Sequence, residues 1–213
     1  MSAFQFHAKQ DLTILLGLRA STVRELREGI ARVPDTSIYF HTHKFLEQHH
    51  YLTPEPSNDF AYWSLAGLND QRMADQLASV DIVQYESIGA LRNRILEVIT
   101  AQEKKRPGTQ RAAEGAEFHF QAVQTFVFPT AFSVETLAEF SDAAQRVSLS
   151  SIYYHMFDAR LRLGKGENDF SAWFRDLGYT SLAGEVRALD PYAYTLESLR
   201  KRLLVLVRRH EHA

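Results

Sequence analysis

Two pairs of histidine and aspartate are the residues of this chain best suited to chemistry: His41 with Asp59, and His155 with Asp169. A histidine whose ring is oriented by a carboxylate can act as a general base or contact a ligand. The same residues also have structural uses, because a buried histidine needs hydrogen-bond partners and an aspartate stabilises the first turn of a helix. The sequence leaves both interpretations open.

Other side chains near these pairs are candidates for a ligand site or for a polar part of the core. These candidates are Tyr39, Trp63, Arg19, Tyr153 and Trp173. No metal centre is expected, because His41 and His43 stand at i and i+2, which point to different faces of a helix. No cofactor is expected either, since the chain contains neither a P-loop nor a glycine-rich dinucleotide fingerprint.

The residues around the two pairs recur in the same order, which indicates an internal duplication. The run Ser37–His41 returns as Ser151–His155, and Asn58–Phe60 returns as Asn168–Phe170. A shared order of several landmarks predicts two copies of one unit joined by a linker. The predicted division is a first copy over residues 1–100, a linker over 101–116 and a second copy over 117–213.

The elements that must position these residues are mostly helical in pattern. Residues 21–33 and the last segment of each copy carry apolar residues at helical spacing. Residues 4–18 and 118–130 fit either a helix or a strand, and we favour a helix that Pro129 ends. The sequence therefore predicts a mostly α fold, with two similar helical lobes from the duplication, related by approximate two-fold symmetry. The alternative is an α+β fold with short N-terminal strands in each copy.

Composition excludes several classes of partner. With 45% apolar residues the chain can bury a sizeable core, and its formal net charge of −2 gives no electrostatic reason to bind nucleic acid or an acidic membrane. No apolar segment approaches the ~20 residues needed to span a bilayer. The start of the chain lacks the charged and apolar pattern of a signal peptide. We expect a soluble cytoplasmic protein with no nucleic-acid or membrane partner.

The landmarks resemble the repeating unit of a bacterial and archaeal family known as a domain of unknown function, DUF5752. That unit runs from a Gly-Arg-Arg-Ala turn through Glu-Leu, Ser-Ile-Tyr-Tyr-His and Asn-Asp-Phe-Ala-x-Trp to a terminal Leu-Arg helix. The matching residues are Gly17, Arg19, Ala20, Glu25, Leu26, Ser37, Ile38, Tyr39, His41, Asn58 to Ala61, Trp63, Ser151 to His155, Asn168 to Phe170 and Trp173.

The resemblance covers nearly the whole chain, once per copy, and implies a family member made of two tandem copies. The second copy departs from the pattern because Ser133 stands in the place of Arg19. An anion contact by Arg19 would therefore exist in the first copy only. The family implies no reaction.

Three functions are compatible with these residues. The first hypothesis is a non-catalytic binding or regulatory module that holds an unknown small polar ligand or a protein partner between the lobes. The second is an enzyme in which His41 or His155 acts as a base and Asp59 or Asp169 orients it. The third is a scaffold whose recurring residues serve folding alone. Whether the chain is an enzyme and whether it forms a homo-oligomer are left open by the sequence.

Overall fold

The chain forms two compact units in the computed structural model, which describes residues 3–44, 57–82, 84–105, 110–159, 167–189 and 195–211. The N-terminal unit consists of Asp11–Gln124. The C-terminal unit consists of Met1–Gln10 together with Thr125–Ala213. The first residues of the chain are therefore grouped with the C-terminal helices.

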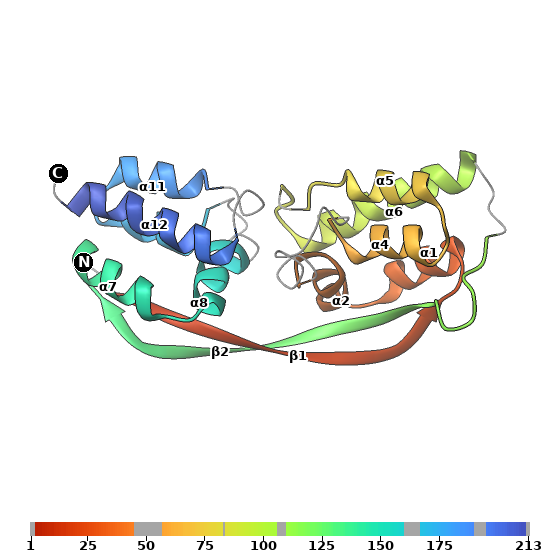
Figure 1. Cartoon of the computed structure of the whole chain (residues 1–213), viewed down its shortest axis with the longest axis horizontal. Helices are drawn as coiled ribbons and strands as arrows, with labels where there is room; N and C mark the ends of the chain where they lie inside the picture. Colours follow the sequence, from red (N-terminus) through yellow and green to blue (C-terminus); the bar gives the residue numbers. More distant parts are fainter. Residues whose placement is uncertain are drawn as a thin grey trace. The chain divides into compact units, whose positions relative to one another are not determined.

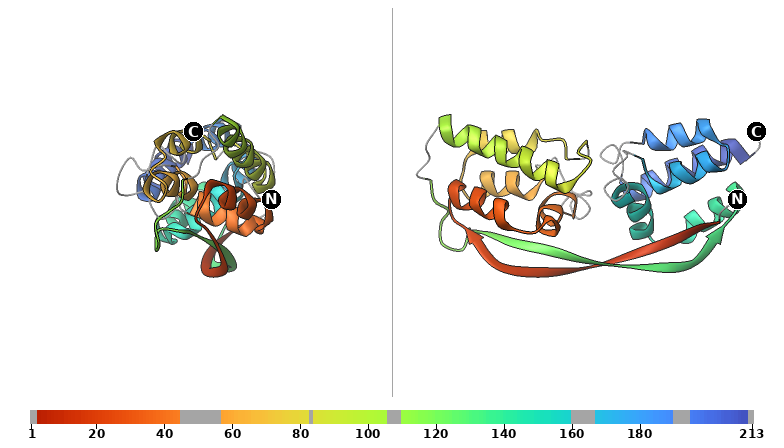
Figure 2. Two further views of the ribbon diagram at one scale, coloured as in Figure 1. Left: turned by 90° about the vertical axis from the view of Figure 1, so that its right-hand side faces the viewer. Right: turned by 180° about the vertical axis from the view of Figure 1, so that it is seen from behind.

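Two long strands pair with each other in a two-stranded antiparallel sheet (Figure 1). Strand β1 runs over Phe4–Ala20 and strand β2 over Phe118–Val134. The views in Figure 2 show the two strands alongside each other. The helix that we favoured for residues 4–18 and 118–130 is therefore wrong. Pro129 is accommodated inside β2, because a strand of a two-stranded sheet is an edge strand, where a missing N–H is tolerated.

The expectation of a mostly α fold, with two helical lobes from an internal duplication, is wrong. The fold is α+β, since the two strands contribute 17 residues each. The alternative of N-terminal strands gave the correct class but strands that were too short. The physical reason is that the alternation of buried and exposed residues at the start of each segment follows the period of a strand, although the same residues also fit a helical stripe.

Short helices make up most of the N-terminal unit. Several of them begin at residues with capping side chains: the Thr22 hydroxyl accepts a hydrogen bond from the Glu25 N–H at 3.2 Å, as expected for an N-cap. Helix α6 packs on α1, α2 and α5. The helices are α1 (Val23–Arg32), α2 (Asp35–Tyr39), the π-helix η1 (Phe40–Lys44), α4 (Asp59–Ala66), α5 (Gln71–Ala78) and α6 (Ile88–Lys105).

The C-terminal unit contains a corresponding series of helices. Helix α12 packs on α7, α8 and α11, and α10 packs on α11. No helix in the described part of the chain has both the length and the apolar character needed to cross a membrane. The helices are α7 (Leu137–Arg146), α8 (Leu149–Tyr153), the π-helix η2 (Tyr154–Asp158), α10 (Asp169–Asp176), α11 (Thr180–Arg187) and α12 (Leu196–Glu211).

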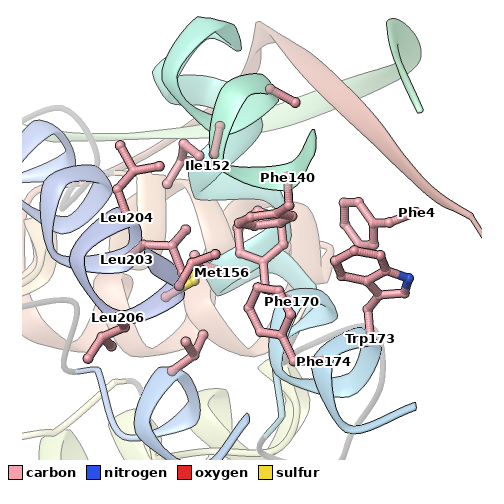
Figure 3. Close-up of a cluster of buried hydrophobic side chains, with 14 of the residues drawn as sticks. Phe4, Phe140, Ile152, Met156, Phe170, Trp173, Phe174, Leu203, Leu204 and Leu206 are labelled. Atoms are coloured by element: carbon pink, nitrogen blue, oxygen red, sulfur yellow. The ribbon is translucent and has the colours of Figure 1, made fainter. Parts of the chain in front are cut away.

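Each strand begins in the core of one unit, and the helix that directly follows the strand in the chain belongs to the other unit. We call residues 4–10 the first strand start and residues 118–124 the second strand start. Phe4 and Phe6 of the first strand start belong to the core of the C-terminal unit. In that core Phe4 lies beside Trp173 (Figure 3). The strand starts are thus exchanged between the two helical segments.

The second strand start fills the core of the N-terminal unit in the same manner. Phe118 and Phe120 are buried there, 3% and 1% exposed. Phe120 lies so close to α1 that a Cβ atom on Gly29 would stand 2.3 Å from the Phe120 Cζ atom. Only glycine fits at position 29 while the ring keeps this place, so the helix and the strand start are shaped for each other.

We expect a chain that is cut between α6 and β2 to remain one particle. A protease site placed at residues 106–109, which lie outside the described residues, would separate the strand starts from the helices with which they pack. Each buried phenylalanine contributes about 1.5–3 kcal/mol through burial of its ring. The two fragments should therefore co-elute in native buffer and separate in urea, as measured by size-exclusion chromatography with light scattering. Fragments that separate without denaturant would contradict the exchange.

Candidate functional site

His41 is buried in the N-terminal unit and uses both of its ring nitrogens. It lies in η1, and its Nδ1 atom is 2.6 Å from Oδ2 of Asp59, the first residue of α4. Its Nε2 atom is 3.0 Å from the backbone nitrogen of Gln121 on β2. A backbone N–H can only donate, so Nε2 accepts and the ring proton is on Nδ1. His41 therefore donates to the Asp59 carboxylate and accepts from the strand.

His155 repeats this arrangement in the C-terminal unit. Its Nδ1 atom lies 2.7 Å from Oδ2 of Asp169, and its Nε2 atom accepts a hydrogen bond from the backbone N–H of His7 at 2.8 Å. The ring is 2% exposed. The predicted approach of each histidine to its aspartate is confirmed, whereas the third member of each group, a backbone N–H from a strand start, was not anticipated.

The start of each aspartate-bearing helix is fixed by an asparagine. The Asn58 side chain accepts from the Ala61 N–H at 2.9 Å, and the Asn168 side chain accepts from the Ser171 N–H at 2.8 Å. Asn58 also donates to the Leu77 carbonyl of α5 at 3.0 Å. These N-caps hold the first turn of α4 and α10 in place. The aspartates are therefore presented to the histidines from rigid helix ends.

Both histidines lie in π-helical turns, which are rare and often occur at functional sites. Turn η1 follows α2 directly, and turn η2 follows α8 directly. In η1 the Thr42 hydroxyl donates to the Ile38 carbonyl at 2.7 Å. A π turn contains more residues than an α turn, so each widened turn alters where its side chains point. Here it places a histidine between a strand start and an aspartate.

Aromatic rings surround each histidine. The ring centroids of His41 and Phe118 are 4.6 Å apart, and those of His155 and Phe4 are 4.9 Å apart. Trp63 also contacts Phe118, and its indole N–H donates to the Ala116 carbonyl at 2.8 Å. The predicted tryptophans therefore lie with the His–Asp pairs. They pack against the strand starts as part of the core.

The remaining predicted candidates contact other groups. Tyr39 stacks on His43, with ring centroids 5.4 Å apart and planes at 3°. The Tyr153 ring lies under the ammonium of Lys9, 4.4 Å from its centroid. Arg19 is exposed near the end of β1. The pKa of the Glu117 carboxyl is held below its usual value. The largest cause is the backbone N–H of Glu117 itself, and the backbone N–H of Gly115 and the charge of Arg19 contribute after it.

Chemically, this arrangement attaches a strand to a helical core. Both imidazole nitrogens are engaged: the Nδ1–H of each ring donates a hydrogen bond to the carboxylate beside it, and Nε2 accepts one from the strand backbone. Among the described residues no group of three or more histidine, cysteine, aspartate or glutamate side chains could hold a metal ion. The site residues thus form a buried polar connection within each unit.

Sequence reasoning missed two largely buried ion pairs that lie next to these groups. Lys9 is paired with Asp158 at 2.9 Å, and Lys44 is paired with Asp11 at 2.8 Å. Each pair joins the last residue of a π-helical turn to strand β1. The signal was present in the sequence, because the residue three positions after each histidine is charged and the sign differs between the two segments.

Comparison with known proteins gives a family but no activity. The model of the Family of unknown function (DUF5752) matches residues 1–208. No curated protein matches the chain. The solved structure of OrfY from Thermoproteus tenax is similar, with a TM-score of 0.83 and 31% sequence identity over 100% of this chain and 97% of that one.

Removal of either histidine should destabilise the protein. His41→Ala and His155→Ala should each lower the free energy of unfolding by about 1–3 kcal/mol, because each leaves a buried backbone N–H and a carboxylate without the ring that bonded them. Urea denaturation measures the change. His119→Ala, at an exposed position of β2, is the control and should stay within about 0.5 kcal/mol of wild type. A His41→Ala protein as stable as the control would refute the structural role.

Proposed function

The chain belongs to the Family of unknown function (DUF5752), and we propose that it is a non-catalytic binding module whose partner is a protein. The observation that carries this proposal is the engagement of both ring nitrogens of His41 and of His155. The groups that looked most suited to catalysis are committed to the core. The exposed apolar side chains of β1, described below, suit contact with another polypeptide.

A catalytic role for the His–Asp pairs is disfavoured by their protonation pattern. A general base needs a lone pair within hydrogen-bond reach of its substrate. The lone pair on Nε2 of His41 accepts the Gln121 N–H, and that of His155 accepts the His7 N–H. A substrate would have to displace a strand start to reach either ring. A histidine that bonds the main chain in this way supports structure.

Strand β1 exposes apolar side chains in its central part. Leu12 is 56% exposed, Ile14 is 38% exposed and Leu15 is 74% exposed. Leu12 and Ile14 share one face of the strand, and Leu15 is on the opposite face. Contiguous exposed apolar side chains commonly mark contacts with proteins. This run favours a protein partner over a small polar ligand, which would need converging polar groups.

The outer edge of β1 is the place where we expect the partner to bind. Each strand of the two-stranded sheet has one edge without a neighbouring strand among the described residues. Strand β2 also exposes apolar residues, at Phe126–Phe128, but Pro129 next to them has no N–H to donate. Strand β1 contains no proline. An extended segment of the partner would therefore add alongside β1 through main-chain hydrogen bonds.

Cross-linking from β1 tests this proposal. A photoreactive amino acid at position 15, introduced in cells that naturally produce the protein, should cross-link to a discrete protein. The same amino acid at position 205 is the matched control, because Val205 is also exposed, 46%, but lies on α12. Equal cross-linking from both positions would contradict a partner site on β1.

A charge at the same place should then abolish binding of the identified protein once it is purified. Leu15→Lys should prevent binding, because it places an ammonium in an apolar contact, while the free energy of unfolding stays within about 0.5 kcal/mol of wild type. Val205→Lys should change neither quantity. Isothermal titration calorimetry and urea denaturation measure the two effects. Unchanged affinity of the Leu15→Lys protein would overturn the proposed function.

A further inference from the structure

The first strand start carries a lysine whose charge is buried. The Lys9 side chain is 1% exposed, and its ammonium lies 2.9 Å from Oδ2 of Asp158 at the end of η2. The same ammonium stands over the Tyr153 ring. A buried ammonium is unfavourable unless an opposite charge compensates its loss of water. The position of Lys9 therefore depends on the charge at residue 158.

The corresponding place in the N-terminal unit carries the opposite charge. Asp158 stands three residues after His155, and Lys44 stands three residues after His41. The Lys44 ammonium pairs with Asp11 of β1 at 2.8 Å, and the Asp11 side chain is 4% exposed. The last residue of each π-helical turn thus meets a residue of β1 with the complementary charge. The two units are distinguished by the sign of that charge.

The other contacts of the strand starts hardly distinguish the two units. The Phe4 ring centroid is 4.9 Å from that of His155 and 5.5 Å from that of Trp173. The Phe118 ring centroid is 4.6 Å from that of His41 and 5.8 Å from that of Trp63. Each strand start also donates one backbone N–H to that histidine. Because these histidine and aromatic contacts are alike, they give little preference for one strand start over the other.

We propose that Lys9, Asp158 and Lys44 determine which helical segment the first strand start joins. If residues 4–10 packed on the helices of the N-terminal unit with the same contacts, Lys9 would face Lys44 in place of Asp158. Two like charges would then be buried together. Asp158 would face Val123, which occupies the place of Lys9 in the second strand start and has no charge. In the observed arrangement Lys9 is paired with the opposite charge of Asp158. In the alternative, Lys9 would meet the like charge of Lys44 and Asp158 would have no partner charge. The observed arrangement is therefore favoured both by attraction and by repulsion in the alternative.

A fluorescent reporter can locate the first strand start in the full-length protein. The chain has no cysteine, so an Ala3→Cys variant accepts a bimane label at one position only. Tryptophan quenches bimane at short range, and the ring of the neighbouring Phe4 is 5.5 Å from the Trp173 ring. The label should be quenched, and Trp173→Phe but not Trp63→Phe should relieve the quenching.

Reversal of the charge on Lys9 should reverse this preference. Lys9→Glu places a negative charge that repels Asp158 and attracts Lys44. The population of molecules whose first strand start lies near Trp173, relative to all other molecules, should therefore fall about tenfold or more. The comparison is with Lys9→Met, which only removes the charge. Adding Asp158→Lys to Lys9→Glu should restore quenching by Trp173 and the midpoint of thermal unfolding. If position 9 needed a lysine only for packing, this exchange of charges would restore neither quenching nor the midpoint of thermal unfolding.

Two results would overturn the proposal. The first is Trp173-dependent quenching in Lys9→Glu that equals the quenching in Lys9→Met, whether both keep or both lose it, because the sign of the charge at position 9 would then have no effect. The second is failure of the double variant to regain quenching, even if Lys9→Glu alone does not fold.

Discussion

The hydrogen bond from a strand backbone to an imidazole is the interaction on which the rest of this structure depends. Because the N–H of His7 or Gln121 can only donate, it fixes the tautomer of the histidine that accepts it. The fixed tautomer in turn needs an acceptor on its other side, which an aspartate supplies. The N-capping asparagines, the π-helical turns and the aromatic rings all serve to bring these three groups together, with the imidazole buried and the carboxylate partly exposed.

This interaction explains why histidine recurs where another polar residue would not serve. A serine or an asparagine is too short to bridge a strand and the end of a helix while it packs among phenylalanines. An imidazole has an acceptor and a donor on opposite sides of a flat ring that also contacts aromatic neighbours. The recurring residues around His41 and His155 are thus accounted for by folding. The exposed apolar residues Leu12, Ile14 and Leu15 of β1 are not among these residues, and they are the ones that we assign to binding.

The sequence predicted the parts of the fold that depend on neighbours along the chain. The apolar spacing of α1, α6 and α12 acts within a few turns, so these helices were correctly located. The pairing of His41 with Asp59 followed from the recurrence of both residues, in the same order, as His155 and Asp169. Arg19 and the tyrosines were also singled out, but their contacts are made with groups outside the His–Asp pairs.

The strands and their exchange could not be predicted in the same way. The middle of β1 is apolar on both faces, so its sequence does not alternate as a half-buried strand does. A backbone N–H has no sequence signature, and the partner of His41 lies 80 residues away in the chain. Gly29 gave no indication that a ring from β2 would fill the space beside it. Non-local packing decided these features.

The exchange of strand starts also sets the order in which the molecule can be completed during synthesis. All residues of the N-terminal unit have been made once Gln124 has left the ribosome. Phe4 and Phe6 cannot be buried in their core until the C-terminal helices exist, and His7 must wait for a residue 148 positions later. Residues 4–10 therefore stay outside their core until the C-terminal helices have been made, and contacts of such long range form slowly. A product that stopped before α12 would leave its first residues without a complete core to enter.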